Sequence, residues 1–219
     1  MLKGNDLKRA LDIVEANHYA HSIPSGKTYA FCLDAAIVLF SVPANKNIAK
    51  FLLGFPGVVW ELTRLWAPNG HEKNLLTRAI SYGVRQMCQV VPKLDALVSY
   101  ADPNVGHAGG VYRAASWIYT GQSEEGRYYK SKEGQVVARR KFHSGKKSMT
   151  KAQILALGYE EFKMPGKHRF AFPISKNAKR ALARFGAMSI ANRTGTKEVG
   201  IMIAKNAAGT DLPGSGEAT

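Results

Sequence analysis

Residues 95–121, DALVSYADPNVGHAGGVYRAASWIYTG, decide how this chain is interpreted. Ala96–Tyr100 is a short apolar run typical of a buried parallel strand. Asp102 follows in a polar turn, and a Gly-rich link leads into a helical pattern through Ser116–Tyr119 that Gly121 is expected to stop. Ligands of open α/β sheets bind outside the carboxyl ends of strands, so Asp102 is a candidate site residue. A simple capping role for Asp102 is the alternative.

A strand, a helix and a second strand form one βαβ unit around this turn. Val58–Trp66 is the first strand, Lys73–Val90 is a strongly amphipathic helix, and Ala96–Tyr100 is the second strand. We expect the two strands to be parallel neighbours, or to splay apart with a cleft between them. Glu61 and Arg64 interrupt the first strand, and a charge there costs several kcal/mol unless it is paired or faces a cleft. We interpret them as site residues, with a structural ion pair or an exposed edge as the alternatives.

The remaining segments complete an α/β domain with a mixed central sheet flanked by helices. The further predicted elements are a helix over 5–17 capped by Asn5 or Asp6, a hairpin of Thr28–Leu33 and Ala35–Val42, a short helix or loop at Ile48–Leu53, a helix at Thr150–Leu157 capped by Thr150, a strand ending near Phe172, and a helix at Asn177–Ala187. We predict a catalytic domain over 1–173 with a basic insertion at about 123–148. A basic, partly disordered tail is expected over 174–219.

Charge points to a polyanionic partner. The chain of 219 residues has a formal net charge of +15, which favours double-stranded DNA over an anionic membrane surface. Cys32 and Cys88 share no motif and are expected to be buried free thiols in a reducing compartment. The charged N-terminal segment is no signal peptide, and no apolar run is long enough to span a membrane. We therefore expect a cytoplasmic protein; a homodimer is left open.

Basic residues alternate with aromatic ones in the predicted insertion. Tyr128 and Tyr129 are expected either to stack on bases or to anchor a hairpin, and the basic residues to contact phosphates. A solvated face is the alternative for the charge run. The residues assigned to DNA are Lys27, Arg127, Lys130, Arg139, Arg140, Lys141, Lys167 and Arg169.

The order of elements resembles the GNAT acyltransferase fold, and several separated motifs are similar to one particular family. These motifs are Asn17-His18-Tyr19, Trp60–Trp66, Leu97–Pro103 with Gly106-His107, and Val111–Trp117. Together they resemble the Mom family of phage DNA-modification proteins, over roughly residues 8–173. The resemblance implies an enzyme that carbamoylmethylates the exocyclic amino group of adenine in duplex DNA and so shields phage DNA from restriction. It also implies acetyl-coenzyme A or another acyl donor, and a bound iron.

The resemblance also implies a set of site residues. Arg64, Asp102 and Tyr112 would be catalytic, with Tyr19 beside them, and Glu61 joins them because of its place in the strand. Asp102 would accept a proton or a hydrogen bond from the amine, Arg64 would pair with Asp102 or stabilise an oxyanion, and Tyr112 would act as an acid. The residues assigned to the donor are Leu65, Trp66, Asn69, Gly70, His71 and Asn74, and those assigned to a metal are His18 and Asp102.

Two other functions remain open from the sequence. The first is a GNAT acetyltransferase that acts on a protein or a small molecule. The glycine-rich phosphate loop of that fold is reduced here to Asn69-Gly70-His71. The second is a nucleic-acid-binding protein without catalytic activity.

Overall fold

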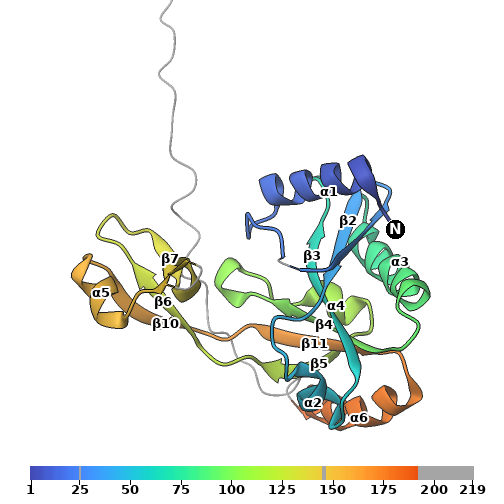
Figure 1. Cartoon of the computed structure of the whole chain (residues 1–219). Coiled ribbons are helices and arrows are strands. Elements are labelled where there is room, and N and C mark those ends of the chain that lie inside the picture. The colour runs from blue at the N-terminus through green and yellow to red at the C-terminus, as the bar shows by residue number, and fades with distance from the viewer. Residues whose placement is uncertain (25, 145–146, 192–219) are drawn as a thin grey trace, which may run out of the picture.

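A six-stranded mixed sheet forms the centre of the computed structural model, which describes residues 1–24, 26–144 and 147–191 (Figure 1). Its strand order is β1-β2-β3-β4-β11-β5, and only β3 and β4 pair in parallel. The strands are β1 (Thr28–Leu33), β2 (Ala36–Ser41), β3 (Val58–Trp66), β4 (Leu94–Ala101), β5 (Ile118–Gln122) and β11 (His168–Pro173). The predicted mixed sheet, including the β3–β4 unit, is confirmed.

Helices cover both faces of this main sheet. One face carries α1 (Gly4–Asn17), α2 (Ile48–Leu53) and α6 (Lys176–Ala191), and the other carries α3 (Leu75–Val90) and α4 (Gly110–Ala114). Alternation along β2 sets these layers, because Ile37 and Leu39 pack under α1 while Val38 and Phe40 pack under α3. The predicted α/β class with flanking helices is therefore confirmed, whereas likeness to the GNAT fold stays a prediction.

The predicted helix through Ser116–Tyr119 is wrong. Helix α4 already ends at Ala114, Ser116 turns the chain with φ +62°, and β5 then begins at Ile118. Gly121 does not stop a helix but lies within β5. Pairing of β5 with β11 at the sheet edge overrides the local helical pattern, which a single-sequence pattern does not reveal.

Two predicted helix caps and the predicted burial of the cysteines can be compared with the structure. Helix α1 begins at Gly4 without a side-chain cap, so the predicted caps at Asn5 or Asp6 are wrong. Helix α5 (Lys151–Ala156) has the predicted cap, as Thr150 and Gln153 form a reciprocal capping box. The cysteines are both free, but Cys88 is exposed, so its predicted burial is wrong.

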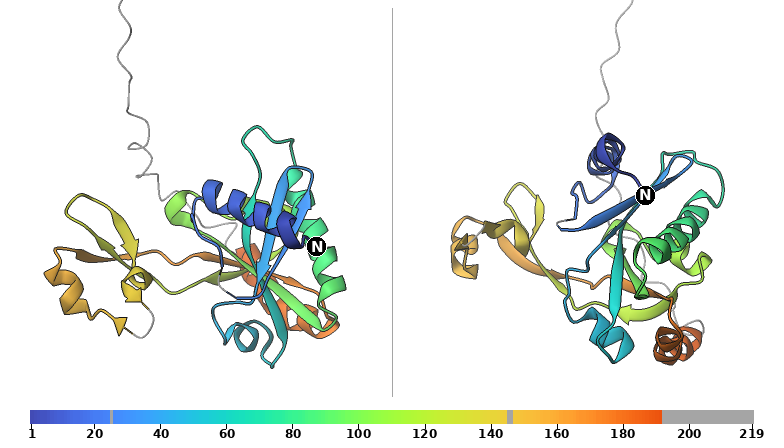
Figure 2. Two further views of the ribbon diagram at one scale, coloured as in Figure 1. Left: turned by 45° about the horizontal axis from the view of Figure 1, so that its top comes forward. Right: turned by 45° about the vertical axis from the view of Figure 1, so that its right-hand side comes forward.

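A second, smaller sheet projects from the main body (Figures 1 and 2). It consists of β10 (Glu160–Met164), β6 (Gly126–Lys130) and β7 (Val136–Ala138) in that order. Together with α5 it forms what we call the small lobe, residues 126–164. Short elements η2 (Arg139–Phe142), β8 (His143–Ser144) and β9 (Lys147–Ser148) complete it. Its core contains Tyr129, Val137 and Ile154.

Helix α6 packs on the main sheet. Its side chains Ala178, Leu182 and Phe185 are buried against strands β3, β4 and β11. The helix predicted at Asn177–Ala187 is thus confirmed, and packed structure continues beyond the boundary drawn at residue 173. The rest of the predicted tail, 192–219, lies outside the described residues. None of the helices in the described ranges is long and apolar enough to cross a membrane.

Candidate active site

Strands β3 and β4 separate halfway along their length. They pair from Val58 and Leu94 up to Leu62 and Ser99, after which β3 continues beside β2 and β4 beside β11. At the point of separation the Ser99 hydroxyl lies 2.7 Å from the Leu62 carbonyl oxygen, to which it donates. Next to the divergent ends lies a cleft of about 540 Å³. Of the two predicted alternatives, parallel neighbours or a splay with a cleft, the first describes the strands up to Leu62 and Ser99 and the second describes their ends.

Asp102 directly follows Ala101, the last residue of β4 and part of the cleft lining, and is only 7% exposed. One carboxylate oxygen accepts hydrogen bonds from the backbone N–H (3.0 Å) and the side-chain amide (2.9 Å) of Asn104. The other lies 2.9 Å from Nζ of Lys167. Burial alone would raise the pKa of Asp102, but Lys167 and the Asn104 hydrogen bonds outweigh it and lower that pKa. Asp102 is therefore an ionised group that caps the turn, which confirms the capping role, whereas its role as a site residue stays a prediction.

His18 and Tyr19 follow the end of α1 and line the same cleft. Nδ1 of His18 accepts a hydrogen bond from the Ala20 N–H at 3.1 Å, which leaves the ring proton on Nε2. Burial, reinforced by the charge of Arg64, lowers the pKa of His18 to about 4. The Tyr19 ring packs 4.3 Å from the His18 ring and edge-on, 4.9 Å, to His107. Burial raises the pKa of Tyr19. Both side chains are therefore neutral at physiological pH.

Arg64 and Glu61 lie on β3. The Arg64 guanidinium donates to the carbonyl and hydroxyl oxygens of Ser22 at 3.0 and 3.1 Å, and so holds the loop after His18 against the strand. Burial raises the pKa of Glu61 to about 7, although the charges of Arg64 and Lys167 oppose the shift. A carboxyl group that titrates near neutral pH is thus part of the same charge network as Asp102.

Tyr112 lies on α4 and is a buried part of the cleft lining. Its hydroxyl lies 2.7 Å from Oγ of Ser99, and its ring stacks on Phe170 with 5.3 Å between centroids. The single Ser99 proton goes to the Leu62 carbonyl, which can only accept, so the Tyr112 hydroxyl donates to Ser99. Burial raises the pKa of Tyr112 to about 12, so this phenol keeps its proton at physiological pH.

Half of the six residues predicted for the donor line the cleft. Leu65, Trp66 and Asn69 line it, while Gly70, His71 and Asn74 are exposed on the loop that leads to α3. Asn74 precedes the helix with φ +67° and forms no side-chain cap. The N-terminus of α3, which has no side-chain cap, therefore follows the part of the cleft wall formed by Leu65, Trp66 and Asn69, to which Leu76 also contributes.

The residues predicted for DNA fall into two groups. Lys167 lies in the site, and two others use their guanidinium groups within the protein: Arg169 donates to Thr120, and Arg139 donates to Tyr129 and Met149. The exposed ones are Lys27, Arg127, Lys130 and Lys141. The side chain of Arg140 lies outside the described residues.

Sequence reasoning missed the role of Lys167 as the partner of Asp102. Strand β11 pairs antiparallel with β4, with His168 opposite Ala101, so the next residues along are Lys167 and Asp102. Only the register of two strands distant in sequence brings this pair together. Neither residue carries a local signal for it.

The donor atoms present do not fit a metal. No group of three or more His, Cys, Asp or Glu side chains within the described ranges could hold a metal ion. Asn104 and Lys167 use three of the roughly four acceptor positions of the Asp102 carboxylate, which leaves room for one further donor, and Nδ1 of His18 already accepts a hydrogen bond. Iron at His18 and Asp102 stays a prediction that this arrangement does not favour.

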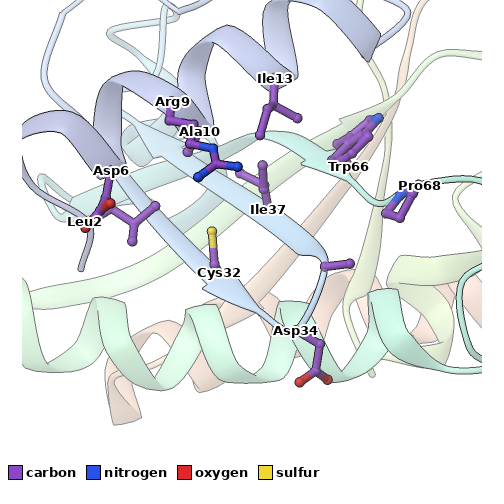
Figure 3. Close-up of a pocket in the computed structure, with 11 residues that line it drawn as sticks. Leu2, Asp6, Arg9, Ala10, Ile13, Cys32, Asp34, Ile37, Trp66 and Pro68 are labelled. Atoms are coloured by element: carbon purple, nitrogen blue, oxygen red, sulfur yellow. The ribbon is translucent and has the colours of Figure 1, made fainter.

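A second cavity, of about 400 Å³, lies between α1 and the β1–β2 hairpin (Figure 3). Its lining is mainly apolar, with Ala10, Ile13 and Ile37 among the contributors, and Trp66 borders both cavities. Burial raises the pKa of its one thiol, Cys32, so that group is a poor nucleophile. Because the titratable cluster lies at the other cavity, the cleft beside β3 and β4 is the candidate active site.

Comparison with known proteins identifies two similarities. The sequence pattern of the Mom protein family matches residues 2–189 of this chain. A stretch of 64 residues is 34% identical to the methylcarbamoylase mom of Escherichia phage Mu. That stretch makes up 29% of this chain and spans 27% of the phage Mu protein.

Proposed function

Because this chain belongs to the Mom protein family, we propose that it is a phage DNA-modifying enzyme acting in the bacterial cytoplasm. Its reaction is the transfer of a carbamoylmethyl group to the exocyclic nitrogen of adenine in duplex DNA, which protects that DNA from restriction. The name of the phage Mu relative supports this class of reaction. The observation that carries the proposal is an ionised Asp102, paired with Lys167 and adjacent to Ala101 in the lining of a cleft next to the diverging strands.

Asp102 positions the adenine amine in this proposal. The amine is a poor nucleophile, and a carboxylate with a lowered pKa is a strong hydrogen-bond acceptor but a weak base. Glu61, with a pKa of about 7, is better matched to take up the released proton at neutral pH, directly or through one water molecule. Neutral Tyr19 and His18 offer an aromatic surface and an N–H donor for the base.

The donor, acetyl-coenzyme A or another acyl compound, is assigned to the wall formed by β3. Beyond Leu62 this strand has no pairing with β4, so an extended, amide-containing chain is assigned to that edge, where the Thr63 carbonyl already accepts a hydrogen bond from Arg64 at 2.7 Å. The uncapped first turn of α3 offers N–H groups suited to phosphate. Transfer of an acyl carbon from an acyl-coenzyme A to the amine, with release of the coenzyme A thiol, would form an amide. A carbamoylmethyl adduct is instead joined to adenine through a CH2 carbon and contains an amide nitrogen, so its formation needs a nitrogen-containing co-reactant besides the acyl donor, and acyl transfer of the GNAT type is proposed only as part of the reaction.

Nucleoside mass spectrometry tests the proposal directly. DNA from bacteria that express the chain is digested and compared with DNA from cells that express Asp102→Asn. We expect deoxyadenosine bearing an added carbamoylmethyl group only with the unaltered protein. Unmodified DNA from cells that contain folded, DNA-binding protein would overturn the enzymatic proposal and favour a binding role.

A further inference from the structure

The small lobe carries much of the positive charge of the molecule. Residues 126–164 contain ten Lys and Arg against three Glu, a net charge of +7 out of +15 for the chain. They account for only 39 of the 219 residues. Such a concentration of one sign suits a polyanion rather than a generic solvated surface.

The two faces of the lobe sheet differ in character. One face packs Tyr129 and Val137 against α5, which forms the lobe core. The residues that alternate with them point to the other face, where Tyr128 lies directly opposite Phe162 with 6.2 Å between ring centroids. Val136, on the same face, is 46% exposed. Neither Tyr128 nor Phe162 belongs to any hydrophobic cluster of the described residues. The lobe therefore has an aromatic pair that its core does not use.

Three other aromatic side chains considered for stacking are occupied by packing. Tyr129 is fully buried in the lobe core, and Trp117 is buried beside Tyr112 in the main core. Trp66 packs under α1. Tyr128 and Phe162 are thus the half-buried aromatic side chains of the lobe sheet that lie outside its core.

The root of the lobe is fastened to the candidate active site. The Lys167 backbone N–H donates to the Ser123 hydroxyl, and the Ser123 N–H donates to the Lys167 carbonyl, both at 2.9 Å. Asn104, the residue that caps Asp102, donates its side-chain amide to the Pro165 carbonyl at 3.3 Å. Phe162 lies five residues before Lys167 on the same chain segment, so the two are at most about 16 Å apart, or about five base-pair steps.

We propose that the face of the small lobe carrying Tyr128 and Phe162 binds DNA beside the target adenine by stacking on an exposed base. The proposal deepens the proposed function and rests on it. Lys130, exposed on the same face, then contacts a neighbouring phosphate. Charge complementarity and continuity with the Asp102 turn both favour a nucleic acid as the occupant.

Binding of the full chain to a labelled duplex with one unpaired adenine, measured over a range of salt concentrations, tests the surface. Tyr128→Ala and Phe162→Ala should each weaken binding by about five- to 150-fold, because stacking on a base contributes about 1–3 kcal/mol. The dependence of affinity on salt should not change, since neither residue is charged. Lys130→Ala should instead lower the slope by about one unit. Leu157→Ala, which removes a 61% exposed apolar side chain at the end of α5, is the matched control and should bind normally.

Conservative variants separate stacking from misfolding of the lobe. Tyr128→Phe and Phe162→Tyr keep a ring and should bind as the unaltered protein does. The inference is overturned if the alanine variants bind normally, if Leu157→Ala loses as much affinity, or if the alanine variants change the salt slope. Measurement of the adenine adduct distinguishes the two proposals. If the variants modify DNA normally and bind it normally, only the proposed stacking surface is refuted. If the unaltered protein leaves no adduct on DNA and the variants bind DNA more weakly, only the proposed enzymatic function is refuted.

Discussion

Glu61 and His18 give the folded protein two pH dependences of opposite sign. Burial raises the pKa of Glu61 from 4.5 to about 7 and lowers the pKa of His18 from 6.5 to about 4. Each shift corresponds to at most about 3 kcal/mol of free energy of unfolding. Between pH 4.5 and 7 the folded Glu61 retains a proton that the unfolded chain has released, so stability falls as the pH rises. Between pH 4 and 6.5 the folded His18 lacks a proton that the unfolded chain binds, so stability rises with pH.

The two effects nearly cancel in the unaltered protein, and a single substitution exposes one of them. Glu61→Gln preserves the shape of the side chain and an acceptor for the Ala44 N–H. It removes the decrease due to Glu61. As the pH rises from 4 to 6.5, the free energy of unfolding of the variant should therefore increase by up to about 3 kcal/mol because of His18 alone. The free energy of unfolding of the unaltered protein should change less over the same range. His18→Asn should show the reverse, a loss of similar size between pH 4.5 and 7.

Urea unfolding at a series of pH values measures these profiles, and urea is preferred because it does not screen charges. Glu160→Gln, which alters an exposed carboxylate of the small lobe, is the control and should follow the unaltered protein. If the Glu61→Gln profile also runs parallel to that of the unaltered protein, Glu61 does not retain its proton in the folded state. The proton-accepting role proposed for it would then lose its physical basis.

Three further substitutions test the site and the fold. Asp102→Asn should abolish adduct formation and leave DNA affinity nearly intact in a binding titration; a parallel loss of affinity would make Asp102 purely structural. Gly109→Ala should destabilise the protein by about 2 kcal/mol or more in urea, because Gly109 has φ +78° and a Cβ would lie 2.2 Å from the Phe170 ring. Gly110→Ala, whose Cβ would meet nothing within 4 Å, should be tolerated. Thr150→Ala should cost about 1 kcal/mol and speed amide exchange in α5, unless the capping box contributes nothing there.

Local patterns were sufficient for the elements that build the cleft. The alternation of β3 and the apolar stripe of α3 depend on the periodicity of neighbouring residues, and the structure confirms both elements. The turn at Asp102 was also predictable, because Asp and Pro favour such turns. These elements place Tyr112 and Tyr19 in the lining of one cleft and Asp102 next to its Ala101, whereas the catalytic roles assigned to the three stay predictions.

What the sequence did not reveal depends on pairing between distant strands. Ile118 and Tyr119 continue a helical pattern, yet they form a strand because β11 offers an edge to pair with. Lys167 was assigned to DNA because it is basic, and the register of β11 against β4 places it on Asp102 instead. The local sequence gives no functional signal for Phe162, which lies opposite Tyr128 because β10 pairs with β6. None of these registers follows from periodicity within one segment.

The root of the small lobe also bears on how such proteins can diversify. Strands β5 and β11 are antiparallel neighbours, with Gln122 opposite His168, so the whole lobe is an elaborated hairpin connection between them. The two connecting segments touch so closely that a Cβ on Gly166 would lie 1.8 Å from the Ser123 carbonyl oxygen. An insertion whose two ends lie side by side, as those of the small lobe do, can be shortened, enlarged or exchanged with little strain on the main sheet. A graft of another lobe between Ser123 and Gly166 would therefore leave Lys167 on Asp102, and DNA preference could change while the chemistry is inherited unchanged.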